Sequence, residues 1–223
     1  MLYYIAIFIL LIPLSILFPI KKIGKKHLKS LKGKNFIISC NHMSNMDPVM
    51  MDITFNKKHR FLAKKELYKN KFFAKCMKSL GAVEVDREHV DPASIREIFR
   101  LIKKNKRICI FPQGTRAKTI KVEEGSAKEG VALFSIRTNT PVVPMMFDRK
   151  FKIFHRTKLL IGEPIYPDMS RKKDPAYVSE YANFIIEKMN ELIDTENAKI
   201  AEKKSKALEK LELKRQKRGA KQQ

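Results

Sequence analysis

The chain opens with a long apolar run. Residues 1–20, MLYYIAIFILLIPLSILFPI, carry no charged side chain, and a helix of about twenty residues reaches about 30 Å, the thickness of a bilayer core. This pattern predicts an N-terminal membrane helix. Pro13 and Pro19 interrupt a straight helix, so a spanning anchor and a re-entrant anchor are both compatible with the run.

From residue 35 onward, short apolar runs alternate with segments of helical periodicity. Residues 36–40 are mainly apolar and predict a buried strand, and Asp47-Pro48 is typical of a helix start. Further strands are predicted at 60–63, 82–86, 107–111, 141–147 and 158–162, and further helices at 65–79, 91–104, 126–137 and 174–194. The alternation predicts an α/β domain with a mixed, largely parallel sheet flanked by helices, which collects ligands at the carboxyl ends of its strands.

Charge divides the chain further. Lys and Arg number 47 against 23 Asp and Glu, a formal net charge of +24. Residues 21–34 contain lysines and no acidic residue, and the last segment is rich in Lys and Glu. We therefore predict an anchor at 1–20, a basic juxtamembrane segment at 21–34, a globular domain at 35–195 and a charged tail at 196–223. The tail is expected to be a frayed helix at the membrane or in solvent.

The order of the first two segments predicts the compartment. A cleaved signal peptide has its basic residues before the apolar run, whereas here they follow it. Cytoplasmic flanks of membrane segments are rich in Lys and Arg, so we expect the domain on the cytoplasmic face of the plasma (bacterial inner) membrane. The three cysteines, Cys40, Cys76 and Cys109, form no C-x-x-C pair, and neither a disulfide framework nor a metal site is expected.

The excess of cations favours an anionic partner: nucleic acid, a phospholipid surface or a phosphorylated substrate. A membrane-tethered nucleic-acid binder is the alternative from another functional class, because a pI near 10 is also typical of proteins that bind the phosphate backbone. An apolar anchor has no purpose in that alternative, and lysine far outnumbers arginine. We therefore expect no nucleic-acid partner.

Two motifs carry candidate chemistry. His42 and Asp47 follow the first predicted strand, and they can meet only if the chain turns between them. A carboxylate that holds a histidine ring makes it a good general base, although an aspartate at this place is also an ordinary helix cap. The second motif follows the strand at 107–111. There Gly114 allows close backbone approach to an anion, and Thr115 and Arg116 suit a phosphate monoester.

Together these motifs resemble the lysophosphatidic acid acyltransferase family. Residues 41–47, NHMSNMD, are similar to the family's first block, N-H-x-x-x-x-D, and residues 111–116, FPQGTR, to its third block, F-P-E-G-T-R. Residues 81–87, GAVEVDR, resemble the second block, and the segment around Pro144 resembles the proline-centred fourth. The similarity extends over about residues 36–162. It departs at Gln113, where the family has Glu, and an amide can form hydrogen bonds but carries no charge.

The resemblance implies a single acyltransferase domain that acts at a membrane. It implies that His42, oriented by Asp47, takes the proton from the sn-2 hydroxyl of lysophosphatidic acid as this oxygen attacks an acyl thioester, giving phosphatidic acid for phospholipid biosynthesis. Transfer is direct, and no cofactor is implied. The acceptor's phosphate is implied to lie against Arg116, Thr115, Gly114 and Arg87.

Several assignments have alternatives. Cys40 is the rival nucleophile, although it falls within the predicted strand. Lys128 either contacts a phosphate of the donor's carrier or is a solvated helix residue, and Gln113 and Asn41 have no assigned role. The alternative acceptors are another lysolipid and glycerol 3-phosphate, and the donor is either acyl-CoA or acyl carrier protein.

Overall fold

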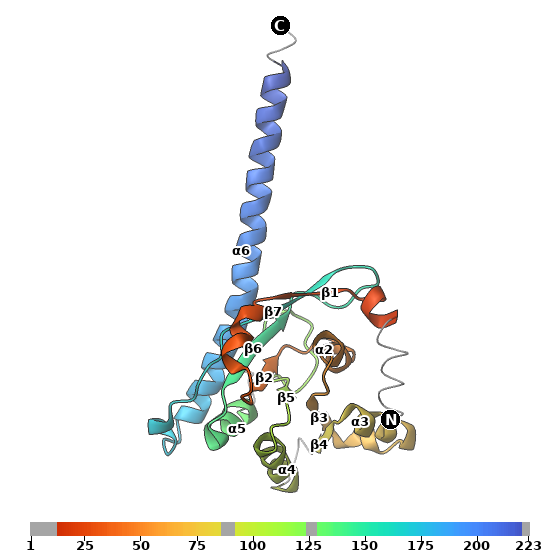
Figure 1. The fold of residues 1–223 in the computed structure, drawn as a ribbon, viewed down its shortest axis with the longest axis vertical. Coiled ribbons are helices and arrows are strands. Elements are labelled where there is room, and N and C mark those ends of the chain that lie inside the picture. Colours follow the sequence, from red (N-terminus) through yellow and green to blue (C-terminus); the bar gives the residue numbers. More distant parts are fainter. Residues whose placement is uncertain (1–12, 86–91, 124–128, 220–223) are drawn as a thin grey trace.

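A seven-stranded sheet forms the centre of the molecule (Figure 1). The computed structural model describes residues 13–85, 92–123 and 129–219. The strand order is β1-β7-β6-β2-β5-β3-β4, and every neighbouring pair is parallel except β6 and β7. The mixed, largely parallel sheet predicted from the sequence is therefore confirmed. The strands are β1 (Ile20–Ile23), β2 (Ile37–Cys40), β3 (Arg60–Lys64), β4 (Val83–Val85), β5 (Ile108–Ile110), β6 (Val142–Phe147) and β7 (Thr157–Ile161).

Helices cover both faces of this sheet. The α-helices are α2 (Asp47–Phe55), α3 (Lys71–Leu80), α4 (Pro92–Lys103), α5 (Gly130–Thr138) and α6 (Tyr177–Gly219), and the short 3₁₀ helices are η1 (Lys25–Leu31), η2 (Lys65–Tyr68) and η3 (Met169–Arg171). Side chains alternate between two buried clusters along each central strand. Ile37 packs with α4, α5 and α6, whereas its neighbour Ile38 packs with η1 and α2.

Strand β1 was not predicted from the sequence. It is a parallel edge strand beside β7, in which Ile20 pairs with Thr157 and Ile23 with Leu160. Its segment lies where the sequence predicted the end of the anchor and the start of the basic juxtamembrane segment. Its two central residues are lysines, so the sequence has no apolar run there that would predict a strand. An edge strand pairs through its backbone and tolerates charged side chains.

The structure does not support the predicted N-terminal membrane helix. Residues 13–17 are helical, but Pro19 follows and Ile20 already lies in the sheet. Within residues 13–85, 92–123 and 129–219, no helix is long and apolar enough to cross a membrane. The anchor's residues 1–12 lie outside the described residues.

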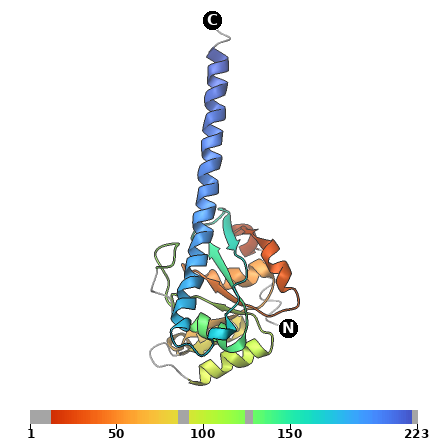
Figure 2. The same ribbon diagram turned by 90° about the vertical axis from the view of Figure 1, so that its left-hand side faces the viewer.

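Helix α6 includes both the predicted last helix and most of the predicted charged tail. The sequence predicts a helix at 174–194 and a tail that is a frayed helix, and in the structure the two form one helix that continues to Gly219 without a break. Its first part packs against the sheet through Tyr181, Ile185 and Met189, and the rest extends beyond the domain (Figure 2). Neither Pro nor Gly occurs between residues 178 and 218, so no residue stops the helix at the domain surface.

Candidate active site

His42 and Asp47 meet at the carboxyl end of β2. The Nδ1 atom of His42 lies 2.7 Å from Oδ2 of Asp47, the first residue of α2. The backbone N–H groups of Met43 and Ser44 donate to the same oxygen, each at 2.7 Å. The turn that the spacing of the two residues required is thus present, and the carboxylate itself closes it.

These contacts determine which ring nitrogen of His42 carries the proton. An ionised carboxylate only accepts hydrogen bonds, so Nδ1 donates to Asp47 and Nε2 keeps a lone pair. Asp47 is 1% exposed and its other oxygen, Oδ1, has no partner among the described residues. The His42 side chain is 16% exposed and its ring stacks on Phe111, with centroids 4.3 Å apart. The ring is therefore held firmly but remains accessible.

The loop after β5 is bound directly to this histidine. The side-chain oxygen of Gln113 accepts a hydrogen bond from the His42 backbone N–H at 3.3 Å, and the Ala117 N–H donates to the His42 carbonyl at 2.8 Å. Gly114 has φ of +69° and donates to the Phe111 carbonyl at 3.0 Å, a tight turn that favours glycine. The fold therefore brings the two sequence motifs together, and Gln113 is one of the links.

Thr115 and Arg116 follow this turn, and both are exposed. They lie on the same loop as Gln113 and Gly114. This loop begins at Phe111, whose ring stacks on the His42 ring. Arg87 and Lys128, the other two candidate phosphate contacts, lie outside the described residues. Of the resembling fourth block, Pro144 lies buried inside β6, where it is paired with Ser39.

Asn41 is a structural clamp. Its side chain is buried, donates to the carbonyls of Phe147 and Ile120 at 3.0 and 3.2 Å, and accepts from the Phe147 N–H at 2.9 Å. These bonds join the residue after β2 to the last residue of β6 and hold the start of the His42 loop in place. Asn41 thus satisfies backbone groups rather than facing the site.

Cys40 is poorly suited to act as the nucleophile. Its side chain is fully buried at the end of β2. Burial, followed by the negative charge of Asp47, raises the pKa of the thiol well above its ordinary value. The reactive thiolate is therefore disfavoured, and the structure argues against the rival mechanism.

Sequence reasoning missed a second His–Asp pair. His59 Nδ1 lies 2.8 Å from Oδ1 of Asp52, which also accepts from the His59 backbone N–H at 2.8 Å. His59 is 0% exposed, so no substrate reaches its ring. The pair ties the end of α2 to the start of β3. The motif D-x6-H has no distinctive spacing, so only the fold reveals it.

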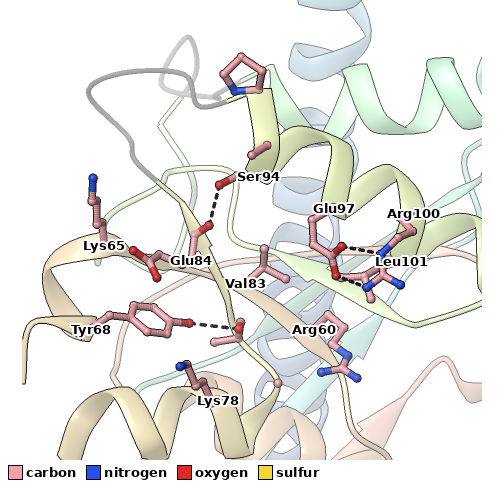
Figure 3. A pocket seen from close by; sticks show the side chains of 14 residues that line it. Arg60, Lys65, Tyr68, Lys78, Val83, Glu84, Ser94, Glu97, Arg100 and Leu101 are labelled. Carbon is pink, nitrogen blue, oxygen red and sulfur yellow. Dashed lines mark hydrogen bonds and ion pairs between the residues drawn. The ribbon is translucent and has the colours of Figure 1, made fainter. Parts of the chain in front are cut away.

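One cavity lies away from the His42 ring. It measures about 900 Å³, lies between β4, α3 and α4, and is lined by none of residues 41–47 or 111–116 (Figure 3). Cations and carboxylates both line it, and Arg100 binds Glu97 with two hydrogen bonds of 2.6 Å. Within the part of the chain that the structure describes, no cluster of three or more His, Cys, Asp or Glu side chains could hold a metal ion.

Comparison with known proteins gives consistent results. The family model described as "Acyltransferase" matches residues 19–148. The chain is 28% identical over 185 residues to the 1-acyl-sn-glycerol-3-phosphate acyltransferase of Bacillus subtilis, covering 78% of this chain and 90% of that protein. It is 27% identical to the enzyme of the same name from Streptococcus pneumoniae, covering 69% of this chain and 59% of that protein.

A solved structure shows the same fold. The crystal structure of the 1-acyl-sn-glycerophosphate acyltransferase PlsC from Thermotoga maritima superposes with a TM-score of 0.55 at 26% sequence identity. The match covers 77% of this chain and 72% of that one.

Proposed function

Because this chain belongs to the acyltransferase family, we propose that it transfers an acyl group from a thioester to the sn-2 hydroxyl of 1-acyl-sn-glycerol 3-phosphate. The product is phosphatidic acid. The acceptor is the one printed in the names of the Bacillus subtilis and Streptococcus pneumoniae relatives. The observation that carries the proposal is the 2.7 Å contact between His42 and Asp47 on the β2–α2 loop, joined to the loop after β5.

We propose His42 as the general base. With Nδ1–H held by Asp47, Nε2 takes the proton of the acceptor's hydroxyl as that oxygen attacks the thioester carbonyl. The new C–O bond forms and the C–S bond breaks. The departing thiolate then takes the proton from the imidazolium, so the histidine returns to its starting state. The negative charge of Asp47 stabilises the imidazolium between these two steps.

The acceptor's phosphate is proposed to lie at the loop after β5. Arg116 supplies a planar guanidinium that can donate two parallel hydrogen bonds, Thr115 supplies a hydroxyl, and the Gly114 turn allows close approach to the backbone. Arg87, and Lys128 for the donor's carrier, remain proposals from the sequence. Gln113 is proposed to position the loop, because its oxygen already accepts from the His42 backbone.

The proposed location is the cytoplasmic face of the plasma membrane, with the apolar N-terminal residues attaching the protein to lipid. Deletion of residues 1–12 tests this and leaves β1 in place. We expect more of the protein in the soluble fraction after carbonate washing. Unchanged membrane attachment would place the anchor elsewhere.

The central experiment is an acceptor and donor panel. Purified enzyme is given 1-acyl-sn-glycerol 3-phosphate, glycerol 3-phosphate or a neutral lysolipid, each with acyl-CoA and with acyl carrier protein thioester, and products are identified by mass spectrometry. We expect phosphatidic acid, and loss of about 10² to 10⁴ in turnover for His42→Ala. His27→Ala, a partly exposed histidine on η1, is the control. Near-normal turnover of His42→Ala would refute the mechanism, and a strict preference for another acceptor would refute the substrate.

A further inference from the structure

Exposed apolar side chains gather at the connection between β6 and β7. Phe154 is 71% exposed and Ile153 is 53% exposed. The backbone N–H of Phe154 donates to the Leu17 carbonyl at 2.7 Å, next to Ile16, which is 63% exposed. Figure 1 shows this connection reaching out from the sheet to lie beside the helical residues 13–17. The two segments therefore form one projecting apolar tip.

The tip is held in a defined conformation. The His155 N–H donates to the Lys152 carbonyl at 3.0 Å, closing a turn in which Phe154 has φ of +59°. Glycine or asparagine is favoured at such a position, and a phenylalanine there is strained. Below the turn, the Phe151 ring packs edge-on against Phe147 and Phe18. The fold thus supports the base of the connection and leaves Phe154 projecting into solvent, where it contributes little to the core.

Cations surround this tip. Lys150, Lys152 and Arg156 are all exposed, and no carboxylate of the described residues forms an ion pair with them. The nearest acidic residue in sequence, Asp148, is engaged by Arg149 and by the Lys158 backbone N–H. Apolar side chains flanked by lysine and arginine fit the boundary between the headgroups and acyl chains of an anionic bilayer. A nucleic acid would use the cations but leave the apolar tip in water.

The connection also lies at the edge of the sheet that carries His42. Strand β6 runs parallel to β2, so both end at the same edge, and the Asn41 side chain binds the last residue of β6, Phe147, through its N–H and its carbonyl. The connection leaves the sheet directly after that residue. A surface bound to the tip would therefore approach the edge where the acceptor's hydroxyl must meet His42.

We propose that this tip is a membrane-docking surface that inserts into the interface of an anionic bilayer and presents the His42 edge to lipid. The docking surface consists of Ile16, Ile153 and Phe154 as the inserted residues and Lys150, Lys152 and Arg156 as the residues that bind lipid phosphates. It is a contact additional to the proposed N-terminal attachment. The inference rests on the proposed function only in expecting the acceptor to reside in the membrane.

A single tryptophan tests insertion directly, because the chain contains no tryptophan. Phe154→Trp in the full chain reports on the tip. Tyr166→Trp is the matched control, since Tyr166 is 57% exposed and follows β7, which runs opposite to β6 and ends at the other edge of the sheet. Each variant is mixed with vesicles of phosphatidylcholine and phosphatidylglycerol, with and without brominated acyl chains. A probe at one position is required because residues 1–12 could hold the whole chain on vesicles.

We expect the emission of Phe154→Trp to shift to shorter wavelength and to be quenched by the brominated lipid, with neither effect in Tyr166→Trp. An unshifted, unquenched Phe154→Trp in protein that sediments with the vesicles would overturn the proposal, as would failure of the protein to bind the vesicles. Equal quenching at both positions would also overturn it, because no single surface would then face the bilayer.

The charge of the docking surface is tested separately. The triple variant Lys150→Gln, Lys152→Gln and Arg156→Gln should bind phosphatidylglycerol vesicles about a hundredfold more weakly, at about fivefold for each cation. The control removes the same charge from exposed lysines of α6, namely Lys203, Lys204 and Lys210. An equal loss in the control would mean that only net charge matters and would refute a specific surface.

These readouts need no turnover, so they remain interpretable if the proposed reaction is wrong. Conversely, acyl transfer to a detergent-dispersed acceptor needs no bilayer. If Phe154→Trp shows no insertion into vesicles but transfers acyl groups in detergent, the docking surface alone is refuted. If it inserts into vesicles but transfers no acyl group, the proposed function alone is refuted.

Discussion

Replacing Asp47 with asparagine separates the structural task of this side chain from its proposed catalytic one. Asparagine keeps one oxygen, which can still accept from the backbone N–H groups of Met43 and Ser44 and from the His42 ring. Its NH₂ group takes the place of Oδ1, which is buried and has no partner among the described residues. The turn should therefore survive, while the negative charge beside the imidazole is lost.

The size of each effect follows from these contacts. A buried donor left without an acceptor costs about 2 kcal/mol, which lowers the Tm of a chain of this size by roughly 5 °C. Opposite charges in a hydrogen-bonded pair near a protein surface attract by about 4 kcal/mol. The amide dipole retains part of this, so we expect the imidazolium to lose about 3 kcal/mol, or close to a hundredfold in kcat.

The assay measures kcat with both substrates saturating, well below the Tm of each variant. His42→Ala is the reference, and it should lose at least as much activity as Asp47→Asn if the carboxylate acts through the histidine. The double variant should be no slower than His42→Ala, because residues that act as one unit are not additive. Asp47→Asn with kcat within fivefold of the unchanged enzyme, and a normal melting curve, would refute this reasoning.

Three further substitutions test neighbouring parts of the site. Arg116→Lys should raise the KM for the phosphorylated acceptor about tenfold and leave the donor KM nearly unchanged, because lysine keeps the charge but loses the planar guanidinium. If steady-state kinetics show a higher donor KM instead, Arg116 belongs to the carrier site. Gln113→Glu should change kcat/KM by less than tenfold, because a carboxylate oxygen can accept from the His42 backbone N–H as the amide oxygen does. A hundredfold gain in kcat/KM on lysophosphatidic acid would mean that the missing charge had impaired the site. Cys40→Ala should keep kcat within about threefold, because burial raises the pKa of this thiol and disfavours the thiolate. A fall in kcat of ~10² or more, as expected for a missing catalytic group, would restore Cys40 as the nucleophile.

Local patterns were sufficient for most of the central sheet. The apolar runs at 36–40 and 107–111 became the neighbouring strands β2 and β5, and Asp47-Pro48 starts α2 as the sequence predicts. Each of these signals lies within a few residues, where the burial of side chains and the geometry of a helix start depend on nearby positions alone. The motif residues were found for the same reason.

Local patterns failed where the deciding partner is distant. Strand β1 exists because its backbone pairs with β7, more than 130 residues away, and its two lysines resemble a solvated segment. Helix α6 continues beyond the apolar residues that pack on the sheet, because neither Pro nor Gly lies between residues 178 and 218. The predicted helix and the predicted frayed tail therefore form one unbroken helix, which the apolar periodicity alone did not show. The predicted N-terminal membrane helix is not supported by the described residues, in which Pro19 and the pairing of Ile20 end the helical residues 13–17 before the sheet.

The sequence alone identified the family resemblance, the α/β class and the residues of two motifs, because residue type and spacing are local properties of the chain. Only the tertiary structure decided how the motifs meet. The hydrogen bond from the His42 backbone to Gln113, the Asn41 clamp on Phe147 and the tip that joins Leu17 to Phe154 each join residues far apart in the chain. Such contacts depend on strand order and register, which are determined by the burial of the whole sheet between its two helical layers.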